Sequence, residues 1–414
     1  MFTRGGGCRG PVVGGAGRVV GEIRRARLPR IKGAPEHFTS TRTANTTLRN
    51  SVFDTMELTH CHTIGASDSF LSRLQGALAF TVVWGLGQFV GPLSPLLLVV
   101  AAFYLPSWLV LVLVASVAYP FLVPNESLYS PRFCRFVLSM AGWLKGGSTL
   151  WASEDVLKLK DRVNESIMVC YHPHGLIPCG FSLNGAVRAR AQDNAMYLPP
   201  WLPLNTSVSG VQAPVLFKIP VRLHAECLPH CMLSASLIWQ VLRHILLAFG
   251  CCVPATKEGV HRLLSTRTTF GIIPGGSEEV ALHQNGRENL YLKKRAGFLK
   301  YALQHGYTLV IAFTFGESDL YKSVSALRPL NLWLVKTFGF VLPIFWGTWF
   351  FPLLPRRDVP LHTVFGKALH LPKIENPTAA QVAEWHATYM RELEDLFDRH
   401  KGQFGYGDRT LKFF

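Results

Sequence analysis

The chain has 414 residues and carries 42 Lys and Arg against 26 Asp and Glu, a formal net charge of +16. Only 16% of its residues are charged, compared with roughly 25% in soluble proteins, and this composition indicates a membrane-associated protein. The positive charge suits an anionic partner such as phospholipid or a phosphorylated cofactor. Nucleic acid is disfavoured, because no basic helix, zinc motif or basic patch with interleaved aromatic residues accompanies the charge.

Nine cysteines occur in no regular framework, and they predict reduced thiols and a site facing the cytosol. His224, Cys227, His230 and Cys231 place metal-binding atoms at short spacing. A zinc site is disfavoured there, because no second pair of ligands follows. No metal ion is therefore expected in this protein.

Residues 1–55 are rich in Gly, Arg and Thr and show no apolar periodicity. We predict a disordered basic tail, with an organelle transit peptide as the alternative. A secretory signal is excluded, because the segment contains no continuous apolar run.

A long uncharged stretch follows, with no Asp, Glu, Lys or Arg from residue 75 to residue 125. Gly and Pro at residues 91–95 divide it into a short apolar segment, 77–90, and a longer one, 96–123, that suffices to span a bilayer. Basic residues flank both ends, Arg73 before and Arg132 after, whereas the turn between is uncharged. The stretch therefore predicts a membrane hairpin over residues 74–125 with both ends in the cytosol.

Residues 143–414 alternate apolar runs with helical patterns and predict a cytosolic domain with a parallel α/β sheet. Residues 167–171 are apolar without a break, which is typical of a strand buried on both faces. Pro173 and Gly175 end this strand, so we expect His172 and His174 on the following loop. In open α/β sheets, ligands bind at such carboxyl ends. The two histidines could hydrogen-bond nearby backbone, bind a metal or act as a general base.

Two further strands are predicted, at residues 268–273 and 308–315, with a helix at 297–304 between them. The first ends at Pro274 and a glycine pair before Glu278 and Glu279, and the second ends at Gly316 and Glu317. Parallel strands put these ends on one edge of the sheet, so a carboxylate from one loop could orient an imidazole from another. Alone, Glu278 and Glu279 would read as ordinary residues at the start of a helix.

An aromatic segment, residues 330–355, contains several Gly and Pro residues, which disfavour a membrane-spanning helix. We predict an interfacial or re-entrant element there, with a third span or ordinary core as alternatives. Residues 378–400 predict an amphipathic helix that is N-capped by Thr378 and stopped by Lys401 and Gly402.

These motifs together resemble the type-2 diacylglycerol acyltransferase family, which also contains monoacylglycerol and wax-alcohol acyltransferases. The resemblance extends from about Leu78 to the C-terminus and does not cover the first 55 residues. The blocks that carry it, in order, are residues 171–175, 274–279, 294–303, 315–317 and 365–367.

The resemblance implies a mainly parallel α/β sheet of the glycerolipid-acyltransferase type and makes His174 the catalytic base. His172, Pro173 and Gly175 would support it. Related acyltransferases use a His-x4-Asp pair, but here Ile177 and Cys179 stand five positions after His172 and His174, so no local Asp can orient the ring. We therefore expect one of Glu278, Glu279 and Glu317 to orient the ring.

The expected reaction is direct acyl transfer from acyl-CoA, as co-substrate and without a resident cofactor, to the hydroxyl of diacylglycerol. Backbone N–H groups of Gly275 and Gly276 would stabilise the oxyanion. The block around Phe298 has Ala296 where the family usually has Lys. The basic residues expected to bind the CoA phosphates are Lys293, Lys294, Arg295 and Lys300.

Monoacylglycerol or a long-chain alcohol could replace diacylglycerol as acceptor, and a non-enzymatic membrane or lipid-droplet protein is the more distant alternative. Lipid substrates imply contact with membrane lipids and a place in the endoplasmic reticulum membrane, with association to lipid droplets or targeting by the N-terminal tail left open. The sequence is also compatible with a homo-oligomer.

Overall fold

The computed structural model describes residues 57–84, 103–104, 106–108, 131–162, 165–184, 208–212, 252–338, 341 and 343–414. Three predicted features lie outside the described residues: the tail (1–55), nearly all of the hairpin after residue 84, and the cysteine–histidine cluster at 224–231. Those predictions therefore stay predictions.

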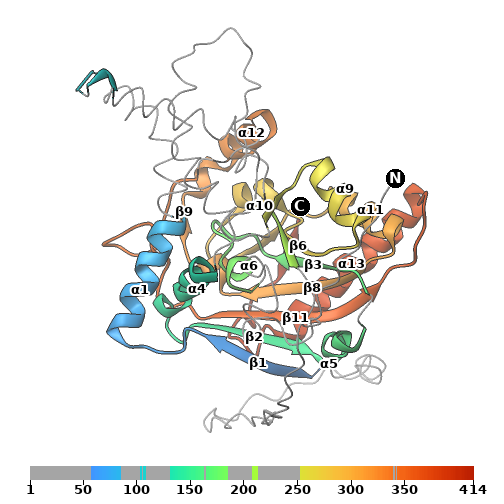
Figure 1. The fold of residues 1–414 in the computed structure, drawn as a ribbon, viewed down its shortest axis with the longest axis horizontal. Coiled ribbons are helices and arrows are strands. Elements are labelled where there is room, and N and C mark those ends of the chain that lie inside the picture. The colour runs from blue at the N-terminus through green and yellow to red at the C-terminus, as the bar shows by residue number, and fades with distance from the viewer. Residues whose placement is uncertain are drawn as a thin grey trace, which may run out of the picture. The chain divides into compact units, whose positions relative to one another are not determined.

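The domain is organised around an eight-stranded sheet with the order β1-β2-β11-β8-β3-β6-β4-β5 (Figure 1). Strands β8, β3, β6, β4 and β5 run parallel to one another, whereas β11 is antiparallel to β8 and β1 is antiparallel to β2. The predicted mainly parallel α/β sheet is thus confirmed. The strands are β1 Leu58–Ile64, β2 Ser148–Ser153, β3 Ile167–His172, β4 Val208–Gln212, β5 Cys252–Pro254, β6 Thr269–Ile272, β8 Thr308–Phe315 and β11 Leu361–His370.

Three of these strands were predicted, and β8 has the predicted bounds. β3 is one residue longer than expected, because His172 continues the ladder opposite Phe313 of β8. The other five strands, β1, β2, β4, β5 and β11, were not anticipated. The sequences of β1, β2 and β11 (LTHCHTI, STLWAS and LHTVFGKALH) show neither an unbroken apolar run nor a regular alternation, so no local pattern marks them as strands.

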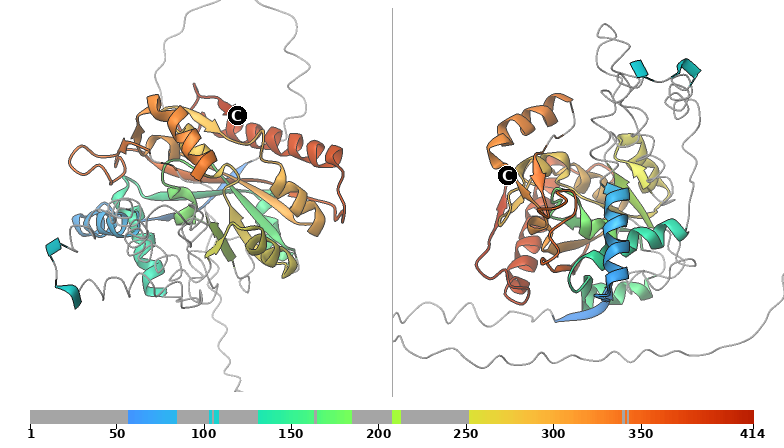
Figure 2. Two further views of the ribbon diagram at one scale, coloured as in Figure 1. Left: turned by 90° about the horizontal axis from the view of Figure 1, so that it is seen from above. Right: turned by 90° about the vertical axis from the view of Figure 1, so that its left-hand side faces the viewer.

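Helices cover both faces of the sheet, as the view from above in Figure 2 shows. On one face α9 (Lys257–Ser265), α11 (Gly297–His305) and α13 (Ala379–His400) pack on Met168 and Cys170 of β3 and on their neighbours in β8. On the other face α5 (Glu154–Leu157) and α6 (Cys179–Asn184) pack on Val169 and Tyr171. The alternation of side chains along β3 therefore buries both of its faces, as predicted.

Helix α13 begins as the sequence predicts. The Thr378 side chain accepts a hydrogen bond from the Gln381 backbone, and the Gln381 side chain accepts one from the Thr378 backbone, which completes a capping box. The helix ends at His400, just before Lys401. Its buried stripe, including Tyr389 and Phe397, faces the sheet.

Helices α1 (Phe70–Phe80) and α4 (Pro131–Leu138) form a separate layer with the 3₁₀ turn η2 (Ser139–Trp143). Gly76 lets α1 approach this turn so closely that a Cβ there would overlap the Trp143 backbone. Phe80 is buried in the core of this layer, while Phe70 and Leu74 on the opposite side are exposed. Within the described part of the chain, no helix combines the length and apolar character needed to cross a membrane.

The aromatic segment at 330–355 consists of α12 (Arg328–Phe338) followed by β10 (Phe345–Trp346), which pairs with β9 (Lys322–Ser323). Trp349 is 91% exposed and Phe350 is 56% exposed. The remaining elements are α10 Gly276–Leu282, β7 Glu288–Leu290, which pairs with β12 Leu411–Phe413, and the 3₁₀ turns η3 Lys158–Asp161, η6 Glu317–Asp319 and η7 Ser325–Leu327.

Candidate active site

The loops that follow β3, β6 and β8 meet at one edge of the sheet, because these strands are adjacent and parallel. The backbone N–H of His174 donates to Glu279 Oε1 across 2.5 Å. Gly175 lies against the Glu317 side chain, where an added Cβ would be 2.9 Å from Cγ. The structure thus brings together the histidine loop and two of the three predicted carboxylates.

His172 belongs to the strand and not to the loop, which corrects the position expected from the sequence. Its ring is fully buried, and Nε2 lies 2.6 Å from the Tyr389 hydroxyl of α13, while Nδ1 has no hydrogen-bond partner. Burial lowers the pKa of His172 to about 3, so the ring is neutral. A neutral ring held by a core tyrosine fixes the end of β3.

His174 is only half-buried, unlike His172. Its Nδ1 lies 3.2 Å from the carbonyl oxygen of Gly175. A carbonyl oxygen only accepts, so Nδ1 carries the proton and Nε2 keeps a free lone pair. Burial lowers the pKa of His174 to about 4, which keeps the ring unprotonated at neutral pH. A neutral imidazole with a free Nε2 is the form that a general base requires.

Glu279 holds the backbone of the histidine loop rather than its ring. Its two oxygens accept from the N–H groups of His174 (2.5 Å) and Tyr291 (2.9 Å), and only 2% of the residue is exposed. Burial raises the pKa of Glu279 to about 7, although both backbone hydrogen bonds lower it. The predicted contact between a carboxylate and the imidazole is therefore wrong for Glu279, because the main-chain donor of His174 is the group that faces it.

Glu278 makes an ion pair with Arg295. This pair joins the first turn of α10 to the segment before α11, so Glu278 is not the orienting carboxylate either. Arg295 also lies over the Tyr291 ring, 5.5 Å from its centroid. Arg295 is consequently a structural partner, and its charge is already compensated.

Glu317 caps α6 from the far side of the loop. Its oxygens accept from the N–H groups of Cys179 (2.8 Å) and Gly180 (2.7 Å) at the start of the helix, where backbone donors lack partners within the helix. The Cys179 N–H also donates to the Ile177 carbonyl across 2.8 Å. Burial raises the pKa of Glu317 to about 8. Gly175 has a φ of 64° and no space for a side chain beside Glu317, so both its conformation and its packing require glycine. Glu317 thus shapes the loop and does not reach the ring.

The glycine pair after β6, Gly275 and Gly276, includes the residue that leaves room for the Glu279 carboxylate. A Cβ at Gly275 would overlap Glu279 Oε2, so only glycine allows the carboxylate to lie where it does. The N–H of Gly276 donates to the Ile273 carbonyl across 3.2 Å. This bond removes Gly276 as the predicted oxyanion donor, because its N–H is already satisfied.

The predicted basic residues do not act as one group. Lys293 and Lys300 line a groove between the start of α11 and α13, whereas Lys294 is exposed and does not line that groove. Phe298 packs edge-to-face on Tyr389, with ring centroids 5.2 Å apart. Phe298 therefore supports the tyrosine that holds His172. Pro173, between the two histidines, is buried.

Sequence reasoning missed two residues of the site. Tyr389 holds His172, and a tyrosine within the buried stripe of an amphipathic helix was a signal, because a buried hydroxyl needs a partner. Burial lowers the pKa of His283 to about 4, and the nearby His174 lowers it slightly further, so the ring is neutral. Its nitrogens face the Ser323 hydroxyl (2.9 Å) and the Ser318 carbonyl (3.1 Å).

No set of three or more His, Cys, Asp or Glu side chains within the described ranges is arranged to hold a metal ion. The site thus offers the neutral imidazole of His174 on a loop whose backbone Glu279 holds by a hydrogen bond and against which Glu317 packs. Tyr389 holds the ring of His172 at the end of the preceding strand. Such an arrangement can accept a proton from a hydroxyl group brought to it.

Residues 210–413 match the protein family described as diacylglycerol acyltransferase, a range that contains Glu279 and Glu317 and begins after His174. The chain is 35% identical to Diacylglycerol O-acyltransferase 1 of Eremothecium gossypii over 45% of its own length and 42% of that protein. It is 40% identical to 2-acylglycerol O-acyltransferase 1 of Bos taurus over 39% of its own length and 52% of that protein. It is 33% identical to Acyl-CoA wax alcohol acyltransferase 1 of Mus musculus over 60% of its own length and 71% of that protein.

The chain thus spans about half the length of the first two of these relatives and a larger share of the third. No solved structure matches the chain.

Proposed function

This chain belongs to the diacylglycerol acyltransferase family, and we propose that it is an acyl-CoA-dependent enzyme that acylates diacylglycerol to triacylglycerol. The observation that carries this proposal is the half-buried His174, with its proton on Nδ1 and a free Nε2. We also propose that the sheet is of the glycerolipid-acyltransferase type. Acyl-CoA is a co-substrate, and the reaction needs neither a resident cofactor nor a metal.

In the proposed reaction, His174 Nε2 removes the proton of the acceptor hydroxyl as its oxygen attacks the thioester carbonyl. The tetrahedral intermediate then collapses, the C–S bond breaks, and the imidazolium returns its proton to the departing thiolate of CoA. The Gly175 carbonyl, which accepts from Nδ1, holds the tautomer in place of a carboxylate. Of the two predicted oxyanion donors, the N–H of Gly275 is the one we retain, because that of Gly276 is engaged.

Direct transfer is favoured over an acyl-cysteine intermediate by the state of the nearby thiols. Cys179 is buried at the start of α6, and burial together with the negative charge of Glu317 raises the pKa of its thiol well above the ordinary value. Burial raises the pKa of Cys170 to about 12. Since the thiolate is the nucleophilic form, neither residue is a suitable nucleophile.

Diacylglycerol is proposed as the acceptor because it is named in the family description and in one of the relatives. A long-chain alcohol is the second candidate, because the relative named for wax alcohol is covered over 71% of its length. Both reactions use the same base on a hydroxyl group, so the catalytic residues do not distinguish them.

Membranes containing the expressed protein should convert labelled acyl-CoA mainly to triacylglycerol when diacylglycerol, monoacylglycerol and a long-chain alcohol are offered together at equal concentration. Thin-layer separation of the lipid classes measures the outcome, and membranes without the protein give the background. Label found chiefly in wax ester would make the long-chain alcohol the acceptor, and label found chiefly in diacylglycerol would make monoacylglycerol the acceptor. Label in no lipid class would end the proposal of acyl transfer.

A membrane location suits these substrates, because each CH₂ transferred from lipid to water costs about 0.8 kcal/mol. We propose that the chain lies in the endoplasmic reticulum membrane with its catalytic domain in the cytosol, held by the predicted hairpin. An exposed apolar surface supports this proposal. Its residues are Phe70, Leu71, Leu74 and Leu78 on α1 and Trp346, Trp349 and Phe350 in the segment after α12.

Trp143 contacts both α1 and the segment that carries Phe350. Its backbone lies against Gly76 of α1, and its ring lies edge-to-face with Phe350 at 6.3 Å between centroids. The same side of the domain carries α1 and β9 in Figure 1. Exposed aromatic rings next to an uncharged segment that begins within α1 suit the interface of a bilayer.

An environment-sensitive fluorescent amino acid placed at Trp349 should shift its emission to the blue in membranes and be quenched by brominated lipid. The same amino acid at Lys160, an exposed residue of η3 outside the apolar surface, is the matched control and should report water. Identical, water-like spectra at both positions would show that the surface does not enter the bilayer.

A further inference from the structure

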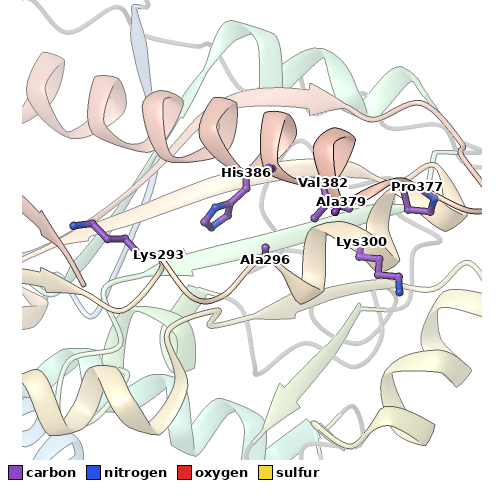
Figure 3. Close-up of a pocket in the computed structure, with 8 residues that line it drawn as sticks. Lys293, Ala296, Lys300, Pro377, Ala379, Val382 and His386 are labelled. Atoms are coloured by element: carbon purple, nitrogen blue, oxygen red, sulfur yellow. The ribbon is translucent and has the colours of Figure 1, made fainter.

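A groove of about 450 Å³ opens between the start of α11 and the start of α13 (Figure 3). Its volume falls within the range of about 300–1,000 Å³ that is common for small-molecule sites. The residues lining it are Lys293, Ala296, Lys300, Pro377, Ala379, Val382, Ala383 and His386. The groove is thus mostly aliphatic, with one lysine toward each end in Figure 3.

Both lysines are available to a ligand. Lys293 and Lys300 are exposed, and neither pairs with a carboxylate among the described residues. Arg295, which lies between them in the sequence, is paired with Glu278 and does not line the groove. The groove therefore holds two uncompensated positive charges on either side of an apolar wall, an arrangement that suits a flat apolar group carrying more than one negative charge.

His386 adds a third element to the groove. Its Nε2 donates to the Leu292 carbonyl across 2.9 Å, which fixes the tautomer and leaves Nδ1 as an acceptor. Burial lowers the pKa of His386, so the ring stays neutral at physiological pH. Figure 3 shows this ring directed from α13 into the groove, toward the segment that carries Ala296. An acceptor in this position favours a ligand with a hydrogen-bond donor on its flat group.

We propose that this groove binds the adenosine 3′,5′-bisphosphate end of acyl-CoA. The adenine ring lies against Ala296 and Val382, its amino group donates to His386 Nδ1, and its phosphate groups contact Lys293 and Lys300. This inference rests on the proposed function for the identity of the ligand. The groove itself would accept any adenosine nucleotide with two separated phosphate groups.

The groove adjoins the histidine loop through two of its walls. On α13, His386 precedes Tyr389 by three residues and so lies on the same helix face, and Tyr389 contacts His172. Beside the other wall, Tyr291 and Arg295 flank the lining residue Lys293 in the sequence without lining the groove themselves, and they bind the carboxylates Glu279 and Glu278. A nucleotide bound in the groove therefore leaves the acyl end of the molecule to extend toward His174.

Equilibrium binding of adenosine 3′,5′-bisphosphate to the full-length protein in detergent tests the site without any acyl transfer. The double substitution Lys293→Glu and Lys300→Glu should raise the dissociation constant by at least about a hundredfold, because each lost charged contact is worth about tenfold. Lys160→Glu makes the same charge change in η3 and should leave binding within about twofold. Inosine 3′,5′-bisphosphate, which replaces the amino group by a carbonyl, should bind several-fold more weakly than the adenosine compound.

Kinetics extend the test to the reaction. The double variant should have a higher KM for acyl-CoA, while its kcat at saturation stays near that of the wild type. Removing the 3′-phosphate from the donor should lower kcat/KM of the wild type markedly, and should lower kcat/KM of the double variant much less. Unchanged bisphosphate binding in the double variant would overturn the site, and equal binding of the inosine compound would overturn the placement of the ring at His386. If the two lysines control bisphosphate binding but the protein transfers no acyl group, the nucleotide site would be supported and the proposed function would be refuted.

Discussion

His174→Ala should lower acyl transfer by about 10²-fold or more, with the protein still folded and still associated with membranes. The reason is that general-base catalysis by a positioned side chain contributes about 10²–10⁴-fold to a rate. The ring nitrogen Nδ1 contacts only the carbonyl of the neighbouring Gly175 among the described residues, so removal of the ring disturbs little of the core. The measurement is the rate of triacylglycerol formation at equal protein level, together with the fraction of protein in the membrane pellet.

Two companion variants make this test specific. His172→Gln should lower thermal stability, because His172 is fully buried against Tyr389, and should reduce the rate less than His174→Ala does. His174→Gln keeps a polar side chain of similar size but offers no imidazole, and it should be as inactive as His174→Ala. A rate for His174→Ala close to that of the wild type would refute the assignment of the base.

Glu279→Ala should lower the rate by about 10²-fold through the position of His174 rather than through proton transfer. Without the carboxylate, the N–H groups of His174 and Tyr291 lose their partners in a buried site, and the histidine loop is free to shift. A displacement of about 1 Å at a catalytic group can cost a factor of this size. Glu278→Gln is the matched control, since it changes the neighbouring carboxylate, whose partly exposed pair with Arg295 is worth about 0–1 kcal/mol.

The pH dependence of Glu279→Gln separates positioning from a merely structural role. The raised pKa of Glu279, about 7, means that the wild-type carboxylate is lost as the pH falls through 7, and with it the ability to accept from both N–H groups. Wild-type activity should therefore fall between pH 8 and pH 6, roughly tenfold or less at the lower end. The amide side chain of the variant does not titrate, so the variant should be less active and flat over that range. An acid limb at the same pH in both proteins would contradict this assignment.

Stability should change in the opposite direction. Because the folded-state pKa of Glu279 lies above its ordinary value of 4.5, its contribution to stability is fully present below pH 4.5 and is lost as the pH rises through about 7. The wild type should therefore lose up to about 3 kcal/mol relative to Glu279→Gln between those pH values. The difference in melting temperature between the two proteins, measured across that range, checks the sign.

Several features of this protein could be read from local sequence alone. Strand β8 and the capped helix α13 have the predicted bounds, because uninterrupted apolar runs and a capping box act through neighbouring residues. The meeting of the histidine loop with Glu279 and Glu317 also followed from local patterns. Parallel strands must present their carboxyl ends at one edge, so three polar strand ends imply one shared site.

The partner of each side chain at that edge was decided only by the tertiary structure. Glu279 meets the backbone of His174 and not its ring, Glu317 caps α6, and Glu278 pairs with Arg295. The residue types were the expected ones, but a carboxylate is equally suited to an imidazole, a backbone N–H or a guanidinium. Which of these it binds depends on displacements of an ångström or two.

Tyr389 and the groove beside it show the same limit over a longer sequence separation. Tyr389 lies 217 positions after His172, and His386 lies 94 positions after Leu292. The sequence by itself determined the strands, the capped helix and the edge of the sheet where the chemistry gathers, because those depend on periodicity and on turn residues. The tertiary structure alone decided which groups touch there, because contacts between distant segments depend on how the helices pack across the sheet, and no local pattern records that packing.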